Sequence, residues 1–295
     1  MRMKYQREYW SKWERVKDPY LRQRKAWKIQ AVLEEAVPGI AHWNGWALDI
    51  GCSTGRITEH FAQLWPDWHV IGVDIDEDAL HWATAHRHYA YFCFGDAMRL
   101  PFPNDSFDLI ICAQVYEHVP DWRCLLQEIH RVLRPGGVCF FSGPNRWFPI
   151  EEHYGIPFLS WFPRFIANRI VRWISNVPFY YENPVSWWTL RKALRDCGFQ
   201  IEDYTYRLLE NPSRFRIEGW WTGWISRCVR GLPKRFRRSL TLFLPNFNLI
   251  IRKPSLPFKA TPPVPSSDTG VPPAAGDCRR CGQPGGRTGR SERPG

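Results

Sequence analysis

The chain has 295 residues, 44% of them hydrophobic, so it is long enough to build one large domain or two small ones around a buried core. Its 40 basic residues exceed its 29 acidic residues, and the net charge of +11 favours anionic partners: nucleic acid, an acidic substrate or an anionic membrane. The polar N-terminus and the lack of any run of about 18 uncharged apolar residues argue against a signal peptide and a transmembrane helix. Nine cysteines, mostly within apolar runs, predict a reducing, cytoplasmic location.

Residues 1–39 predict an N-terminal helical cap. The segment RQRKAWKIQAVLEEAVPG places Ile29, Val32 and Leu33 roughly on one helical face, and Pro38-Gly39 ends the helix. The far end of the chain is different in kind. Residues 253–295 are rich in Pro, Gly and Arg, which predicts a disordered tail.

Between these ends, residues 40–252 predict one α/β domain. Short, uniformly apolar runs alternate with helical stretches, which is typical of buried parallel strands in a doubly wound sheet. The aromatic segment 144–185 interrupts this rhythm, and we expect it to form a lid. A basic amphipathic helix is expected at 208–240. The predicted strands are 46–50, 68–73, 91–94, 107–113, 137–142, about 199–207 and about 242–252.

The stretch ALDIGCSTGRITEH, residues 47–60, predicts a ligand site. A strand ends near the acid Asp49, and Gly51, Ser53 and Gly55 follow before a helix begins. Glycine lets the chain turn tightly, and the new helix presents free N–H groups and the positive end of its dipole. Such a turn also occurs for packing alone, so the acids farther along the chain decide between the two readings.

Two further acids follow the next two predicted strands. Asp74 ends the strand in VIGVDIDEDAL, where an α/β nucleotide site places a carboxylate for ribose hydroxyls. Asp96 follows the third strand in FGDAMRLPFPNDSFDLI, where it can accept from an adenine amino group while Ala97 and Met98 cover the ring. One acid at a strand end usually caps a helix. Acids after three successive strands favour a nucleotide-like cofactor.

Five segments in this order and spacing resemble the class I S-adenosylmethionine-dependent methyltransferases: LDIGCSTG, VIGVDID, GDAMRLPFPNDSFDLI, VYEHVPD and EIHRVLRPGG. The resemblance is greatest to the bacterial small-molecule and quinone-biosynthesis methyltransferases. It implies S-adenosyl-L-methionine as cofactor and a Rossmann-like doubly wound seven-stranded sheet with the last strand antiparallel. An aromatic helical lid would be added to that sheet.

The resemblance also implies roles for individual residues. Ser53 is a departure, because the family usually has Gly at this position, and we expect cofactor binding to survive it. In the implied site, Asp49 and the turn Gly51–Ser53–Gly55 hold the methionine part, Asp74 binds the ribose, Ile75 and Ala97 lie against the adenine, Asp96 meets its amino group, and Gln114 lines the methionine end.

The acceptor is less well indicated. After the fourth strand the chain reads AQVYEH, not the Asp/Asn-Pro-Pro-aromatic motif typical of nucleobase amino methylation, so nucleic acid is not favoured. Glu117 and His118 follow that strand. They either support the structure of the site or act in catalysis, with His118 as a base. His153, beside Glu151 and Glu152 in the insertion, is the expected base for O-methylation, although it can equally serve only to fix its loop.

Two segments, WFPRFIANRIVRWISNV and FRIEGWWTGWISRCVR, combine an aromatic stripe with arginines. They predict either peripheral binding to an anionic membrane, at its inner face, or packing as a lid.

We therefore expect O-methylation of a small or lipid-like acceptor. The alternatives are C-methylation of a quinone-type ring and a non-catalytic, membrane-associated protein that binds the cofactor. The lone CRRC at 278–281 predicts no metal site, and the oligomeric state is not indicated.

Overall fold

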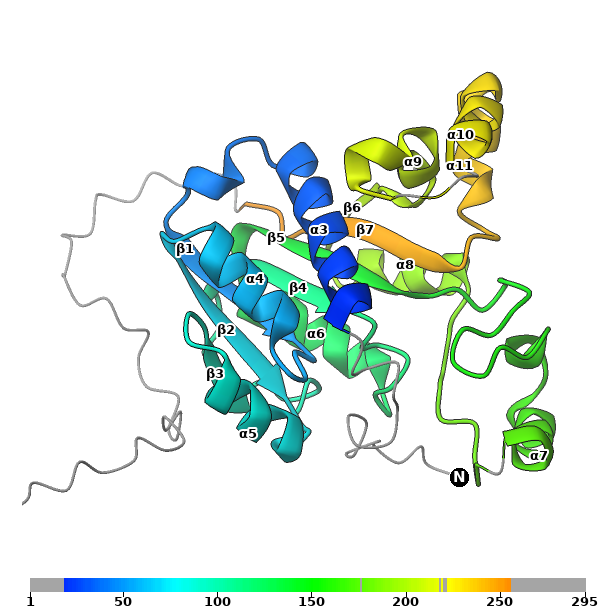
Figure 1. Ribbon diagram of the computed structural model, residues 1–295, viewed down its shortest axis with the longest axis horizontal. Helices are drawn as coiled ribbons and strands as arrows, with labels where there is room; N and C mark the ends of the chain where they lie inside the picture. The colour runs from blue at the N-terminus through cyan, green and yellow to red at the C-terminus, as the bar shows by residue number, and fades with distance from the viewer. Residues whose placement is uncertain (1–18, 176, 218, 220–221, 256–295) are drawn as a thin grey trace, which may run out of the picture.

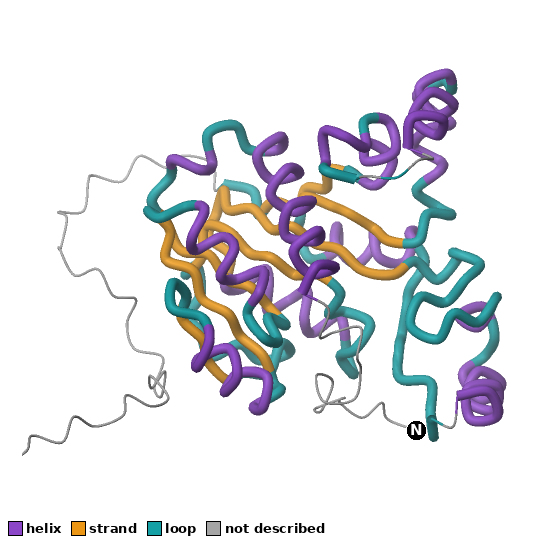
Figure 2. Tube along the Cα trace, viewed as in Figure 1, coloured by secondary structure: helices purple, strands orange, loops and turns teal. Residues whose placement is uncertain are grey.

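The computed structural model describes residues 19–175, 177–217, 219 and 222–255. A seven-stranded sheet in the order β3-β2-β1-β4-β5-β7-β6 forms its centre (Figures 1 and 2). Only β7 runs antiparallel to its neighbours β5 and β6, as the resemblance implied. The strands are β1 (Gly45–Ile50), β2 (Trp68–Asp74), β3 (Tyr91–Phe94), β4 (Phe107–Ala113), β5 (Leu133–Pro144), β6 (Gln200–Asp203) and β7 (Asn246–Arg252).

Helices cover both faces of this sheet (Figure 1). They are α3 (Pro19–Ala36), α4 (Arg56–Leu64), α5 (Glu77–His86), α6 (Trp122–Val132), α7 (Arg164–Ser175), α8 (Trp187–Asp196), α9 (Thr205–Glu210), α10 (Thr222–Gly231) and α11 (Lys234–Leu240), with short 3-10 turns at Ile40–His42, Leu159–Trp161 and Pro212–Phe215.

The central strands are apolar on both sides because each side meets a helical layer. Along β4, Leu109 and Ile111 join the core under α3 and α4, whereas Ile110 and Cys112 join the core under α6 and α8. The strand order reverses between β1 and β4. In open α/β sheets the carboxyl ends of the strands at such a reversal form the ligand crevice.

Several expected boundaries differ from the structure. Strand β5 (Leu133–Pro144) extends beyond the expected strand 137–142 at both ends. The expected strand 199–207 ends at Asp203, because its carboxylate accepts the N–H of Thr205 (2.8 Å) as α9 begins. The single helix expected at 208–240 is divided among α9, α10 and α11, since Pro212, Gly231 and Pro233 interrupt it. Most of the predicted tail, 256–295, and residues 1–18 of the cap lie outside the described residues.

The aromatic insertion has a small core of its own, formed by Leu159, Ala167, Val171 and Tyr180. Helix α7 therefore buries the face that carries Ala167 and Val171. The apolar stripe, read from the sequence as either a lid or a membrane-binding face, is divided: Ile170 packs partly against this core, whereas Trp173 is 86% exposed. Within the described residues, no helix is long and apolar enough to cross a membrane.

Candidate active site

A cavity of about 470 Å³ lies at the carboxyl ends of β1, β2 and β4. Helix α3, the insertion and the segment at Arg216 and Ile217 complete its wall. The predicted residues that line it are Asp49, Gly51, Ser53, Asp74, Ile75, Ala97, Gln114, His118 and His153. Three others, Gly55, Asp96 and Glu117, are not among its lining residues.

The turn after β1 uses three residues with left-handed backbone conformation: Gly51 (φ +72°), Ser53 (φ +49°) and Gly55 (φ +67°). A Cβ on Gly55 would lie 2.5 Å from the Phe92 ring, so Gly55 serves close packing beside the cavity. Ser53 adopts a conformation that favours glycine, which gives a physical reason for the glycine that the family usually has there. The Asp74 carboxylate accepts the N–H of Ser53 (2.7 Å) and so supports this strained residue.

Two buried carboxylates face the same cavity. The Thr58 hydroxyl donates to Asp49 (2.7 Å), yet burial dominates and raises the pKa of Asp49 to about 7. Asp74 accepts the N–H groups of Ser53 and of Asp76 (2.9 Å), and burial raises its pKa as well. Burying carboxylates at this point favours a ligand that brings cationic and hydroxyl groups to them.

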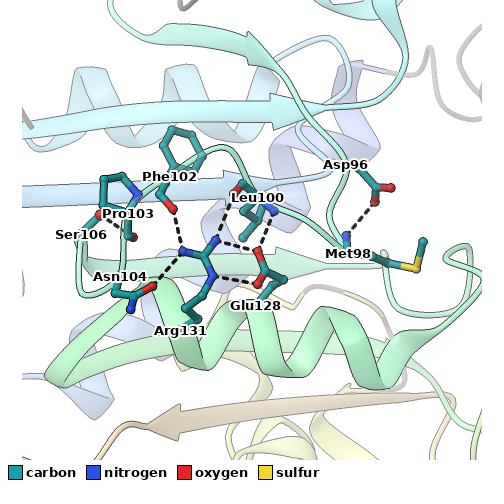
Figure 3. Close-up of polar contacts among 9 residues, drawn as sticks. All are labelled: Asp96, Met98, Leu100, Phe102, Pro103, Asn104, Ser106, Glu128 and Arg131. Carbon is teal, nitrogen blue, oxygen red and sulfur yellow. Dashed lines mark hydrogen bonds and ion pairs between the residues drawn. The ribbon is translucent and has the colours of Figure 1, made fainter. Parts of the chain in front are cut away.

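The loop after β3 is held by α6 (Figure 3). Arg131 donates to the carbonyls of Phe102 (2.7 Å) and Leu100 (3.0 Å), and Glu128 accepts the N–H of Leu100 (2.7 Å). The hydrogen bond from Arg131 lowers the pKa of Glu128. This loop carries Ala97 to the cavity wall.

Asp96, on the same loop, accepts the N–H of Met98 (2.7 Å) and forms a local turn (Figure 3). Asp96 is not among the lining residues of the cavity, although its neighbours Gly95 and Ala97 are, and its contact with the adenine amino group stays a prediction.

A chain of side-chain amides and an acid crosses the other end of the cavity. Gln114, just after β4, donates to Asn246 (2.7 Å), and Asn246 donates to Glu152 in the insertion (2.5 Å). Sequence reasoning missed Asn246. It begins β7 and pairs with Pro144 at the end of β5. Only the antiparallel register brings it there, and no local motif marks it.

Beside this chain lies an acid–base cluster. The carboxylate of Glu151 accepts the backbone N–H groups of His153 (2.8 Å) and Tyr154 (2.7 Å), and its other oxygen lies 3.2 Å from His153 Nδ1. The His118 ring stands edge-on to His153, with 5.1 Å between centroids. Glu117 is fully buried behind His118, with 3.7 Å between Glu117 Oε1 and His118 Nε2.

The two histidines differ in charge. Burial lowers the pKa of His118 well below its usual value, so this ring is neutral near pH 7. Burial also lowers the pKa of His153, but the hydrogen bond with Glu151 and the nearby carboxylates of Glu182 and Glu117 outweigh it and raise that pKa to about 9. Burial raises the pKa of Glu117. The cluster therefore concentrates its positive charge on His153.

Glu117, His118 and His153 each bring one ligand atom within 4.8 Å of the others, so among the described residues they also form a set that could hold a metal ion. The sequence predicted no metal in this protein. His153 Nδ1 is already turned toward Glu151, so its other nitrogen would have to serve as the ligand.

Helix α3 supplies basic residues that sequence reasoning treated only as part of a cap. Arg22, Arg24, Lys25 and Lys28 line the cavity, and Arg22 donates to the Ser53 hydroxyl (3.4 Å). The spacing of these basic residues in the sequence could have indicated that they share one face of the helix. Positions 22, 25 and 28 recur at helical intervals beside the apolar face that packs on the sheet.

The family model described as "Methyltransferase domain" matches residues 48–141, which run from β1 to β5. Two bacterial relatives named demethylmenaquinone methyltransferase also match. The protein of Symbiobacterium thermophilum is 29% identical over 185 residues, covering 55% of this chain and 71% of the relative. That of Staphylococcus aureus is 31% identical over 164 residues, covering 52% of this chain and 67% of the relative.

Among solved structures, the fold matches one from the complex between the Trm112 methyltransferase activator of Haloferax volcanii and its partner protein. The TM-score is 0.54 at 16% identity, and the match covers 85% of this chain and 99% of the other. The shared architecture therefore extends beyond the segment that the family model covers, through the antiparallel β7.

Proposed function

Because the chain belongs to the class I S-adenosylmethionine-dependent methyltransferases, we propose that it transfers the methyl group to a hydroxyl oxygen of a small or lipid-like acceptor. S-adenosyl-L-methionine is the methyl donor of this family. The observation that carries the proposal is the Glu151–His153 pair. His153 lines the same cavity as Asp49 and Asp74, and with Glu151 at its Nδ1 the ring can remove a proton from a hydroxyl.

The residues around the cavity fit the cofactor. Its volume lies within the roughly 300–1,000 Å³ of small-molecule sites. The buried acid Asp49, with Gly51 and Ser53 and with Gly55 behind them, suits the cationic methionine part. Asp74 and Ile75 suit the ribose and adenine, together with Ala97 and the loop of Asp96, and Gln114 lies toward the methionine end.

When bound, the cofactor supplies an electrophilic methyl group on a sulfonium. The protein's part is alignment of the acceptor and removal of its proton. Glu151 holds His153 Nδ1, which leaves Nε2 as the nitrogen that takes the hydroxyl proton. His118 packs edge-on against that ring and, with Glu117 behind it, fixes the orientation of His153.

C-methylation of a quinone-type ring is the second candidate, and the names of the relatives favour it, since both are demethylmenaquinone methyltransferases. In that reaction a ring hydroxyl would lose its proton to His153 and the neighbouring ring carbon would take the methyl group. That carbon would then lose its own proton, and the hydroxyl would regain one as the ring becomes aromatic again. The two reactions give different products. In the carbon NMR spectrum an O-methyl group and a ring C-methyl group are separated by tens of ppm.

We further propose that the protein binds peripherally to an anionic membrane, at the cytoplasmic face. Phe165 on α7 is 74% exposed, and Trp224 on α10 is 69% exposed. Both helices lie on the right-hand side of the molecule in Figure 1. Aromatic side chains beside a basic flank suit a lipid interface. The basic flank of α10 and α11 consists of Arg227, Arg230, Lys234, Arg235, Arg237 and Arg238.

Methyl-labelled S-adenosylmethionine and an extract of the host cell test these proposals. After reaction, organic and aqueous phases are separated and the label is located. Label in the organic phase supports a lipid-like acceptor. Label in the aqueous phase alone supports a small polar acceptor and contradicts the lipid-like one. No transfer by a protein that binds S-adenosylhomocysteine contradicts the proposed reaction and favours a non-catalytic role. Repetition with EDTA shows whether the histidine cluster works through a metal.

A further inference from the structure

Two lysines on α3, Lys25 and Lys28, line the wall of the cavity, and the proposed methyl transfer gives neither of them a role. Helix α3 packs on the sheet and α4 through the buried residues Ala26, Ile29 and Leu33. Lys25 and Lys28, three positions apart, lie on the face that lines the cavity. The fold therefore places two ammonium groups side by side at a ligand site.

Within the described part of the chain, these ammonium groups have no carboxylate in direct contact. Among the described residues, neither Lys25 nor Lys28 has a hydrogen-bond or ion-pair partner within 4 Å. The acid that chiefly acts on both is Glu152, at longer range. The carboxylate of Glu152 already accepts a hydrogen bond from Asn246 (2.5 Å). Glu152 thus acts on both cations while it is hydrogen-bonded to Asn246, and the buried Glu117 adds to it only at Lys25.

Their protonation equilibria reflect this shortage. Lys25 is exposed at the mouth of the cavity, whereas Lys28 is half-buried, and burial together with the charge of Lys25 lowers the pKa of Lys28 to about 8. An anion placed between the two groups would offset both effects.

The carboxylate of the cofactor is not the anion expected to pair with Lys25 and Lys28. It has a single carboxylate, and Arg22 already lies at the turn assigned to its methionine part, where it donates to Ser53 (3.4 Å) and acts on Asp49. Lys25 instead acts electrostatically on His118 and Glu117, in the acid–base cluster. The two lysines therefore belong to the acceptor end of the cavity.

We propose that Lys25 and Lys28 form an anion subsite for the methyl acceptor, which carries a carboxylate or phosphate group in addition to the hydroxyl that is methylated. This inference rests on the proposed function, since it names the class of acceptor for the same site. Two ammonium groups hold one end of the acceptor, and His153 serves the other. Both a free acid and the phosphate headgroup of a lipid satisfy this chemistry.

Calorimetry on the full chain saturated with S-adenosylhomocysteine tests the subsite. The probes are benzoate, phenyl phosphate, dodecyl phosphate and the neutral benzyl alcohol. Anionic probes are expected to bind, with at least a tenfold loss of affinity in Lys25→Gln or Lys28→Gln and no detectable binding in the double variant. The double Lys→Arg variant should retain binding. Lys192→Gln is the matched control, because Lys192 is exposed on α8 and pairs with Asp196 (2.8 Å).

The outcomes separate the sources of the anion and the two proposals. Tighter binding of dodecyl phosphate than phenyl phosphate identifies a lipid headgroup, and the reverse identifies a free acid. Benzyl alcohol binding as tightly as benzoate, or anion affinity unchanged in the double Gln variant, overturns the subsite. A protein that binds S-adenosylhomocysteine but no anion also overturns it and leaves the methyltransferase assignment standing. Lysine-dependent anion binding without methyl transfer supports the subsite and contradicts the proposed reaction.

Discussion

Asp49 illustrates a conflict between folding and ligand binding at a single residue. It is 2% exposed, and burial raises its pKa to about 7. Since the folded-state pKa lies above the unfolded value, this residue favours the fold below about pH 4, and the benefit is lost as the pH rises through about 7. Near neutral pH the ligand-free protein therefore carries a partly ionised, buried carboxylate.

Asp49→Asn should remove that ionisation while keeping an acceptor for Thr58. We expect the variant to unfold at a higher temperature than the parent above pH 7, by several degrees, with the difference vanishing near pH 4. Its affinity for S-adenosylhomocysteine should fall. Thermal denaturation between pH 4 and pH 8 and calorimetry check the two effects, with the exposed Asp67→Asn as control. A pH-independent difference in melting temperature would contradict the argument.

The raised pKa of His153 leads to a second prediction, about the pH dependence of the reaction. Burial lowers its pKa, but Glu151, Glu182 and Glu117 raise it to about 9, so only the minor, deprotonated form can act as base at pH 7. We expect kcat/KM to rise with pH toward 9. Glu151→Gln should lower the midpoint by about one to two pH units, in both the rate profile and an NMR titration of the ring. An unchanged titration in this variant would contradict the role of Glu151.

The sequence predicted residues of the site where a local motif marks them. Asp49, Gly51 and Asp74 stand at strand ends, and the structure brings all three to the cavity. The sequence could not show that the Asp96 carboxylate accepts the N–H of Met98, because no local motif marks this turn. The place of Lys28 in the cavity wall was missed, since it depends on where α3 packs.

Among the elements, α6 has the additional task of anchoring the loop that reaches the cavity. Arg131 and Glu128 bind this loop at Leu100 and Phe102 (Figure 3). Arg131→Lys should loosen the loop, because lysine cannot reproduce the fork of hydrogen bonds. Affinity for S-adenosylhomocysteine should fall roughly fivefold, equivalent to about 1 kcal/mol.

Arg134→Lys is the matched control for this test. Arg134 binds Asp108 (2.6 Å) and the carbonyl of Asp105 (3.1 Å), at a distance along the loop from Leu100 and Phe102. Equal losses of affinity in the two variants would mean that general destabilisation, and not the anchoring of the loop, explains the result.

Element types were easier to predict than helix faces. The apolar runs at 107–113 and 68–73 became β4 and, with one more residue, β2, because strands buried on both sides leave an unambiguous pattern. For α7 the sequence left two readings of the aromatic stripe open, packing as a lid or binding to a membrane. In the structure Ile170 packs partly against the small core of the insertion, beside Ala167 and Val171, whereas Trp173 is exposed. Periodicity identifies an apolar face without showing what covers it.

For the whole molecule, the net charge of +11 and the exposed aromatic residues predict association with anionic vesicles. The protein should float with such vesicles at low salt, and the floated fraction should fall as the ionic strength rises. Replacing both Trp173 and Trp224 by Ser should reduce flotation about tenfold or more. Trp188→Ser is the control, since Trp188 is exposed on α8. If the double substitution leaves flotation unchanged, the aromatic residues of α7 and α10 do not bind the membrane, and the proposal of peripheral membrane binding through them is wrong.

The wall of the cavity runs from Leu21 on α3 to Ile217, near the end of the domain. These distant segments meet directly, since Glu35 pairs with Arg214 (2.7 Å) and Phe215 shares a core with Leu33. A contiguous fragment therefore contains the complete wall only if it spans residues 21–217. During synthesis, the pocket closes only after nearly the whole sheet and its flanking segments exist. Affinity for S-adenosylhomocysteine therefore reports whether these distant segments have come together. A fragment that ends before Arg214 should form strands of the sheet but should not bind S-adenosylhomocysteine.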